Sequence, residues 1–427
     1  MKTTNLPFYI TLLEWYEFTI YNLLLPYKIF SGEAGIYRDL LIIAASFLSR
    51  PIGAILASRL EDKDSALRLT LFIMTLSTLG MAVGIQGQSG WFVLMKVMQG
   101  LAIGGSYGVA SLKVYEDEEG KERSRINYLL AKVHTGWAWG MLIGQITVLS
   151  IKLLVRSRQE LMQTISTGSL KALLLLTPST QFVSWGWRIP FLLSGLAGTT
   201  LLLRTRTGKL LNSLSMLTSN QDAANNTMRD ISKYLRKNLL IFICIFSVAM
   251  LDMSISHLWN TYSDIAREVN NSQLLTGLIP TLKLIIYIFL FPICGHITDK
   301  LNRILGNQQG NYIMLFLVCV SMMLSAKYAP WHSLAQALVC AITCCLCFGS
   351  LTSWIIYHIE KPARRYIFGL TVNLVGSTVG GFLPVIAAYT KEIYGIAGLS
   401  RLMFALGALS FVSLLYTWRK KSGLRRD

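Results

Sequence analysis

Charged residues are scarce in this sequence of 427 residues: Asp, Glu, Lys and Arg make up 15% of it, below the roughly 25% typical of soluble domains. Acidic residues are the scarcer kind, since 22 of them stand against 40 Lys and Arg, which gives a formal charge of +18. Hydrophobic residues make up 53% of the chain, and this excludes a disordered protein. A basic excess in a polar chain would suggest a nucleic-acid partner, but the apolar content argues against one here.

Cysteine is also sparse, and its distribution excludes several functions. The seven Cys are odd in number and lie in apolar runs, which favours packing over a disulfide scaffold. Cys340 and Cys344 would share a helix face, but no His or acid stands at ligand spacing, so we expect neither a metal nor a cofactor. The glycine pair at 104–105 does not fit the phosphate-binding loop of an ATP-driven pump. No Ser/His/Asp arrangement suggests an enzyme.

Long apolar runs are what the sequence has in abundance. A membrane-spanning helix needs about 20 mostly apolar residues, and twelve segments qualify, which predicts an all-α membrane protein. They lie near 7–28, 38–57, 69–88, 91–113, 127–151, 186–203, 238–261, 274–297, 311–326, 332–357, 366–389 and 399–418.

The basic residues between these segments predict an orientation. If the N-terminus is cytoplasmic, 25 Lys and Arg fall in cytoplasmic segments and 10 on the opposite side. Lys and Arg are enriched in cytoplasmic loops, so we expect both termini in the cytoplasm, with the lipid bilayer as surroundings.

The polar segment 204–237 divides the spans six and six. It predicts an N-terminal half over 1–203, a cytoplasmic central loop over 204–237, and a C-terminal half with a basic cytoplasmic tail over 238–427. The predicted loops at 58–68 and 295–303 follow the second span of each half, and both carry an Asp-Lys pair. Two related six-helix halves are typical of secondary transporters, whose site lies near the membrane midplane between the halves.

Four stretches carry a resemblance to a known family. They are Glu14 to Phe18 with Tyr21, Phe47 to Gly53, the residues Lys96, Gln99, Gly100, Gly104, Gly105 and Tyr107, and Trp185 to Phe191. These stretches resemble the major facilitator superfamily (MFS), and within it the metabolite:proton symporters, which include proline/glycine-betaine, α-ketoglutarate, citrate and shikimate transporters. The resemblance implies the MFS fold of twelve helices in two halves, alternating access, a monomer, and a bacterial inner membrane as the location.

Two departures from that family stand out. The loop after the second helix keeps only Asp62 and Lys63 of the pattern, since Ser58 to Ala66 lacks the three glycines and the final Arg. In the fourth helix Ser106 stands where the family has Glu, which is a candidate proton-coupling group there. These departures predict altered gating and place proton coupling on other acids.

Acids inside the spans are the candidates for proton coupling. A charge at the bilayer centre costs about 2.5–3.5 kcal/mol, so it needs a partner or a watery cavity. Glu14 and Glu17 share a helix face and either couple protons or pair with intramembrane bases. Asp252 either replaces the acid missing at 106 or pairs with Lys283, and His257 titrates near neutrality.

The remaining candidates bind solute or form gates. Lys96 corresponds to the family's fourth-helix base, and the Arg50 guanidinium suits a carboxylate of the solute or of Glu14 and Glu17. The aromatic residues Trp15, Tyr16 and Tyr107 complete the expected solute site, with packing as the alternative for the first two. The expected gating residues are Asp62, Lys63, Asp299, Lys300 and Arg303.

Two functional hypotheses follow. The first is a secondary transporter of a small polar organic solute with H⁺, a proline- or betaine-like zwitterion being favoured over a di- or tricarboxylate such as α-ketoglutarate or citrate. The second is a degenerate relative that acts as a sensor or non-transporting membrane component, motivated by the altered loop and Ser106.

Overall fold

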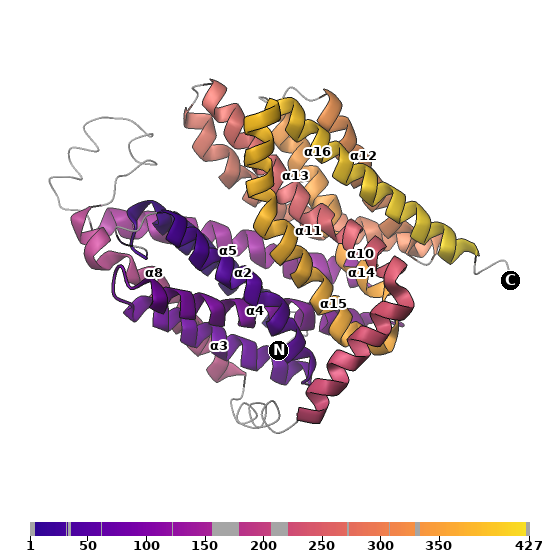
Figure 1. The fold of residues 1–427 in the computed structure, drawn as a ribbon, viewed down its shortest axis with the longest axis horizontal. Helices are drawn as coiled ribbons and strands as arrows, with labels where there is room; N and C mark the ends of the chain where they lie inside the picture. Colours follow the sequence, from indigo (N-terminus) through magenta and orange to yellow (C-terminus); the bar gives the residue numbers. More distant parts are fainter. Residues whose placement is uncertain are drawn as a thin grey trace.

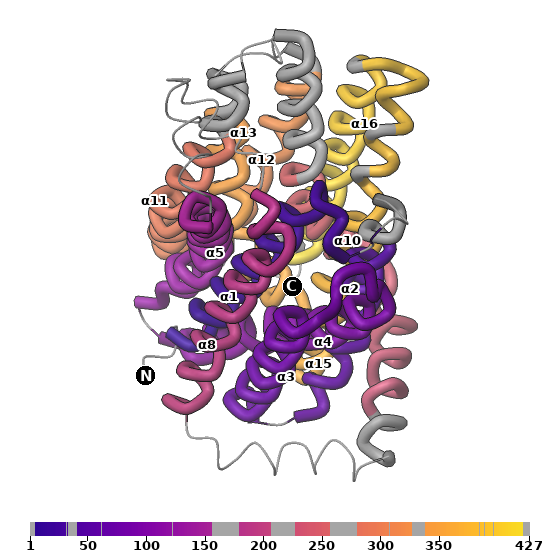
Figure 2. Tube along the Cα trace, turned by 90° about the vertical axis from the view of Figure 1, so that its left-hand side faces the viewer, coloured from indigo at the N-terminus to yellow at the C-terminus, as the bar shows by residue number. Residues whose placement is uncertain are grey.

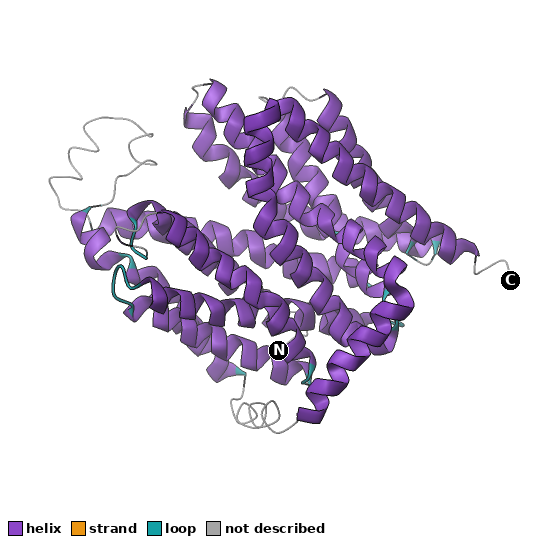
Figure 3. Cartoon of the chain, viewed as in Figure 1, coloured by secondary structure: helices purple, strands orange, loops and turns teal. Residues whose placement is uncertain are grey.

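The computed structural model is built of helices. It describes residues 5–30, 32, 36–60, 62–121, 123–155, 179–205, 221–270, 273–306, 308–328 and 334–423. These residues contain helices, turns and loops but no strand (Figure 3).

Six long helices form the N-terminal half. They are α1 (Asn5–Leu24), α2 (Ile36–Ser58), α3 (Lys63–Val83), α4 (Ser89–Glu118), α5 (Ile126–Leu154) and α8 (Arg188–Arg204). Two short helical segments, η1 (Leu25–Tyr27) and η3 (Phe182–Gly186), lie between them. Helix α2 packs on α4, α1 on α5, and α3 on α8.

The C-terminal half has the other six spans. Its helices are α10 (Gln221–Asn270), α11 (Gln273–Leu305), α12 (Gln309–Tyr328), α13 (Leu334–Phe348), α14 (Leu351–His358), α15 (Lys361–Val375), η5 (Gly376–Gly380) and α16 (Gly381–Gly423). Helices α13 and α14 together make the tenth span, and α15, η5 and the start of α16 make the eleventh. Figure 1 shows the two halves as separate bodies, with α1–α8 in indigo to magenta and α10–α16 in red to yellow.

Two of the long helices are each broken once. The backbone of α10 leaves helical geometry at Asn238, so 221–237 is a separate helical segment before the seventh span. The backbone of α16 breaks at Gly395, where φ is +62°, a conformation that costs glycine little and other residues more. This break separates the eleventh span from the twelfth.

The twelve-helix, two-half prediction is confirmed. Ten of the described segments are long and apolar enough to cross a membrane, and α1 and α8 complete the set. Two loop predictions are wrong in extent: 295–303 is not a loop, because α11 continues to Leu305, and the loop predicted at 58–68 is helical from Lys63 onward. The polar residues that suggested a loop continue the helix beyond the apolar stretch. Hydropathy marks where the apolar stretch ends, and it does not mark where the helix ends.

Both ends of the described chain lie at one end of the bundle, which we call the termini end. Leu6 of α1 packs in one cluster with Leu67 at the start of α3 and Leu202 at the end of α8. Trp418 of α16 donates to Gln309 at the start of α12. Figure 2 shows the halves in contact through α5 beside α11, and α15 below α2 and α4, in agreement with the helix contacts. The basic-residue count predicts that this end is cytoplasmic.

Glycine permits the closest of the helix approaches. A Cβ on Gly104 of α4 would overlap the carbonyl oxygen of Arg50, and one on Gly53 of α2 would overlap that of Leu101. Small residues let helix backbones meet in this way inside membranes. The α2–α4 contact holds Arg50 beside the residues of α4 that carry the family resemblance.

Candidate functional site

Glu17 of α1 is held by neutral hydrogen-bond donors. Its side chain is 2% exposed. Gln99 Nε2 of α4 donates to one carboxylate oxygen at 2.6 Å, and Ser194 Oγ of α8 donates to the other at 2.8 Å. Both oxygens are therefore engaged by fixed donors on two neighbouring helices, which anchors α1 to α4 and α8.

Glu14 lies one turn earlier on the same face and meets the residue that departs from the family. Ser106 Oγ of α4 donates a hydrogen bond to Oε1 of Glu14. Both residues are almost fully buried. Position 106 therefore carries a hydroxyl that contacts an acid, where the family has an acidic side chain. The carboxylate beside this position comes from Glu14 of α1.

The two intramembrane bases do not form close ion pairs with these acids. Within the described residues, no nitrogen of Arg50 or Lys96 lies within 4.0 Å of a carboxylate oxygen. Lys96 Nζ lies 4.2 Å from the ring centre of Tyr21, and the Arg50 guanidinium lies 4.0 Å from that of Phe47. The Arg50 Nε is buried with no hydrogen-bond partner there.

Direct ion pairing of Arg50 or Lys96 with Glu14 or Glu17 is therefore not what this conformation contains. Cation–π contacts leave most guanidinium and ammonium hydrogens available, so a carboxylate of a solute could take them.

Asp252 of α10 belongs to the C-terminal half, on the other side of the boundary between the halves, and is half-buried. Ser256 Oγ donates to its backbone carbonyl at 2.9 Å. The side chain of His257 lies outside the described residues.

Tyr107 belongs to a small polar group that crosses that boundary. Its ring lies 5.6 Å from that of His134 on α5. His134 Nε2 lies 3.0 Å from the Thr352 hydroxyl of α14. His134 is not among the predicted site residues; the signal that could have found it is a single imidazole within the apolar span 127–151.

The predicted aromatic residues divide between two places. Trp15 lies edge-on to Trp137 of α5 at 5.6 Å, and Trp137 stacks on Phe291 and Phe348 of the other half at 5.8 and 5.6 Å. This aromatic group lies across the boundary between halves. Tyr16 instead donates to the Pro190 carbonyl of α8 at 3.2 Å, which is away from it.

At the termini end, Asp62 caps the start of α3. It accepts from the backbone N of Asp64 at 3.2 Å and of Ser65 at 3.1 Å, and from Ser65 Oγ. Burial, the largest influence, would by itself raise the pKa of Asp62, but these hydrogen bonds and the charge of Arg68 outweigh it and lower the pKa. Asp62 thus serves its own helix.

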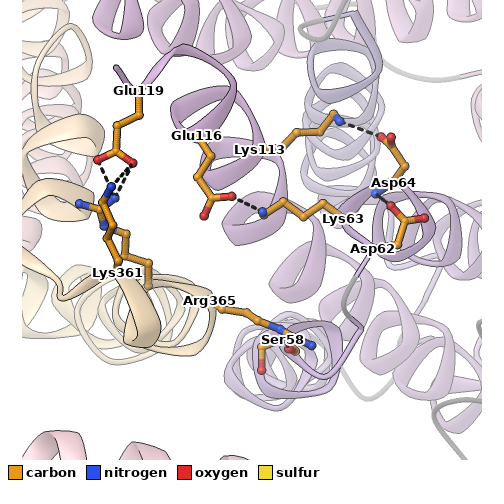
Figure 4. Close-up of polar contacts among 10 residues, drawn as sticks. Ser58, Asp62, Lys63, Asp64, Lys113, Glu116, Glu119, Lys361 and Arg365 are labelled. Carbon is orange, nitrogen blue, oxygen red and sulfur yellow. Dashed lines mark hydrogen bonds and ion pairs between the residues drawn. The ribbon is translucent and has the colours of Figure 1, made fainter. Parts of the chain in front are cut away.

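The halves meet at this end through charged side chains of α15, in a contact that we call the α15 seam. It consists of Ser58, Glu119, Lys361, Arg364 and Arg365, of which all but Arg364 are labelled in Figure 4. Arg364 Nη1 lies 3.0 Å from both oxygens of Glu119, and Lys361 Nζ lies 3.6 Å from one of them. Arg365 Nε donates to the Ser58 carbonyl. Lys63 pairs instead with Glu116, within its own half.

The second contact at this end, which we call the α5–α11 seam, consists of Asn127, Tyr128 and Asp299. Asp299 Oδ1 accepts from the Asn127 backbone N at 3.0 Å and its Nδ2 at 2.9 Å, and Oδ2 accepts from the Tyr128 N at 2.9 Å. An acid of one half thereby caps the first turn of α5 in the other. Lys300 is exposed, and Arg303 Nε lies 3.4 Å from the Asp299 backbone oxygen of its own helix.

The described residues offer no metal site. No group of three or more His, Cys, Asp or Glu comes together in them. The seven cysteines are free and buried.

The arrangement defines a class of membrane protein: two six-helix halves that enclose buried charges between them, as in secondary transporters. The profile of the Major Facilitator Superfamily matches residues 8–384. The chain belongs to this superfamily, whose members move small solutes and are not enzymes, and it is a multi-pass membrane protein.

Its relatives are bacterial transporters of small organic solutes. The chain is 24% identical over 436 residues to the alpha-ketoglutarate permease of Escherichia coli strain K12, covering 97% of this chain and 93% of the relative. It is 25% identical over 412 residues to the glycine betaine/proline/ectoine/pipecolic acid transporter OusA of Dickeya dadantii strain 3937, covering 89% and 75%.

Solved structures share the fold. The proton:xylose symporter XylE, bound to 6-bromo-6-deoxy-D-glucose, aligns with a TM-score of 0.66 at 12% identity, covering 98% of this chain and 94% of that one. The E. coli fucose:proton symporter FucP aligns with a TM-score of 0.61 at 13% identity, covering 97% and 98%.

Proposed function

We propose that the protein is a proton-coupled symporter that carries a small zwitterionic solute of the proline or betaine type by alternating access. The observation that carries this proposal is the pairing pattern of the buried charges in the N-terminal half. Buried acids are held by neutral donors, and buried bases rest on aromatic rings. Glu14, Arg50 and Lys96 therefore remain available for an exchangeable partner, which they would not be in a locked ion pair.

Glu14 is the proposed proton carrier. A serine hydroxyl can both donate and accept, so the Ser106 contact can persist whether Glu14 is ionised or protonated. Glu17 differs in one contact, because the amide nitrogen of Gln99 can only donate and therefore favours the ionised carboxylate. We assign Glu17 to anchoring α1, and Asp252 to coupling from the opposite half.

A zwitterion fits this set of groups. Arg50 and Lys96 would take its carboxylate, while Glu14 and the ring of Trp15 would face its cationic nitrogen. The betaine/proline relative is compatible with that choice, and the alpha-ketoglutarate relative supports the dicarboxylate alternative. The bacterial inner membrane with both termini in the cytoplasm is part of the proposal. With that orientation, the contacts at the termini end close the cytoplasmic side.

Uptake into proteoliposomes under an imposed pH gradient tests the proposal. A proton that moves down 100 mV yields about 2.3 kcal/mol, which corresponds to nearly fifty-fold accumulation per charge. We expect labelled proline or glycine betaine to accumulate, and E14Q to retain exchange of bound solute while losing accumulation. The matched variant E17Q should lower the amount of folded protein without abolishing coupling in what remains.

Two outcomes would contradict the proposal. Uptake that ignores the gradient would remove proton coupling, and preferential uptake of α-ketoglutarate would replace the zwitterion with a dicarboxylate. Solute binding without any flux would favour the non-transporting alternative. The variant S106E, which restores the family acid, would then show by regained uptake that only proton coupling was lost.

A further inference from the structure

A cavity adjoins the α15 seam. In the α5–α11 seam, the corresponding place is occupied by the carboxylate of Asp299. Asp62 and Asp299 follow the second span of their halves, and each precedes a Lys. Asp299 reaches across to the first turn of α5. Asp62 turns back onto α3, so it does not reach across to α15. Among the described residues of the N-terminal half, Glu119 is the one acid that pairs with the first turn of α15.

The cavity left there has a volume of about 260 Å³ and is formed by both halves. Helices α2, α3 and α4 contribute one wall, and α15 contributes the other. Its polar lining includes Ser58, Lys63, Glu116, Lys361 and Arg365, and the rest is apolar. The volume lies just below the ~300–1,000 Å³ of pockets for drug-sized ligands, so it suits a single small headgroup.

The charge around the cavity is positive. Four bases, Lys63, Lys361, Arg364 and Arg365, stand against two acids, Glu116 and Glu119. Glu116 serves Lys63, and Glu119 serves both Arg364 and Lys361. Arg365 has no acidic partner in the described chain; its Nε donates to the Ser58 carbonyl, and both terminal nitrogens remain for a ligand (Figure 4).

We propose that this cavity binds a phosphate group through the free terminal nitrogens of Arg365, with Lys361 of α15 and Lys63 of α3 in its walls. The excess of two bases favours an anion, and the fork of a guanidinium matches phosphate oxygens. Because the walls come from different halves, the site exists only while the termini end is closed. The anion therefore stabilises that conformation and slows its conversion to the other.

Thermal unfolding of the purified full-length protein provides the test, and it does not depend on transport. Inorganic phosphate should raise the melting temperature in a saturable way at constant ionic strength, where sodium chloride does not. R365Q should weaken the apparent phosphate affinity about tenfold or more, as expected for loss of a charge-assisted hydrogen bond. R365K keeps the positive charge but lacks the guanidinium fork, so its phosphate affinity should lie between those of the wild type and R365Q.

Two controls separate a built site from general charge effects. R229Q removes an exposed base of α10 that does not line the cavity, and it should keep the wild-type response to phosphate. Vesicles of phosphatidylglycerol, with phosphatidylcholine as the neutral reference, distinguish a lipid headgroup from a free phosphate: stabilisation by the lipid alone identifies the headgroup as the source. The proposal is overturned if neither phosphate nor phosphatidylglycerol stabilises the protein, or if R365Q and R229Q respond alike.

Discussion

The two seams close the same end of the molecule by opposite means. The α5–α11 seam joins the halves through one buried carboxylate and three uncharged N–H donors at 2.9–3.0 Å. The α15 seam joins them through ion pairs of the Glu119 side chain, which is 30% exposed, with the buried side chain of Arg364 and with that of Lys361, which is 74% exposed. A cavity adjoins the second seam.

This difference sets what each seam can contribute. Fixed donors around a buried acceptor give a contact that costs much to leave unmade. Exposed ion pairs are weak and are screened by salt. We therefore expect the α5–α11 seam to hold the halves in register and the α15 seam to be the one that opens readily.

The largest effect is expected at Asp299. D299A leaves the Asn127 and Tyr128 donors without their acceptor and should destabilise the protein by about 1–3 kcal/mol, seen as a lower melting temperature. D299N retains one acceptor oxygen, so its effect should be smaller. A D299A melting temperature equal to that of the wild type would mean that the two seams do not differ in the way described.

Opening of the α15 seam should follow from E119Q. Arg364 is 6% exposed and would lose its carboxylate partner, which favours the open seam by about 1–2 kcal/mol, or roughly tenfold in equilibrium. The rate of maleimide labelling at a cysteine placed at Ser58, which is buried in the seam, reports that opening. D117N removes an exposed acid nearby and serves as the control, which should label at the original rate. Equal rates in both variants would contradict the ion-pair role.

The sequence predicted one side of this comparison better than the other. Hydropathy and charge placed the twelve spans, and the family pattern brought Glu14, Glu17, Arg50 and Lys96 to one region, because each depends on local residue types. The cap that Asp299 provides for α5 was missed, since its partner Asn127 lies 172 residues away and carries no local signal. Predicting 295–303 as a loop also hid the helix that aims this carboxylate.

The pairing partners of the buried acids were equally beyond sequence reasoning. Ser194 reaches Glu17 from the sixth span, and a single serine in an apolar run gives no direction. The contact between Ser106 and Glu14 shows this limit most clearly. The sequence identified the acid that is missing at position 106, but it did not predict that Ser106 would contact the carboxylate of Glu14.

A smaller effect is expected from removing the cap of α3. D62A should destabilise the protein by about 1 kcal/mol, the usual cost of losing an Asp N-cap. The pKa of Asp62 is lowered in the folded protein, so its contribution is present above the ordinary carboxyl pKa of about 3.9 and is lost as the pH falls through the lowered value. The difference in melting temperature from the wild type should therefore stay constant from neutral pH to about pH 5 and shrink below about pH 4. A gap that persists unchanged at low pH would show that the cap does not act as a carboxylate.

The smallest effect is expected from K63Q, and its smallness sharpens the comparison. Lys63 pairs with Glu116 inside the N-terminal half, and their side chains are 29% and 38% exposed, so the pair should contribute less than about 1 kcal/mol and less still in high salt. Because neither residue crosses to α15, labelling at position 58 should stay at the wild-type rate in buffer without phosphate. The same variant should nevertheless weaken phosphate binding, since Lys63 lines the cavity. If K63Q weakens phosphate binding and leaves the labelling rate unchanged, the cavity and the neighbouring ion pairs act independently. Faster labelling in K63Q would instead show that Lys63 is part of the α15 seam.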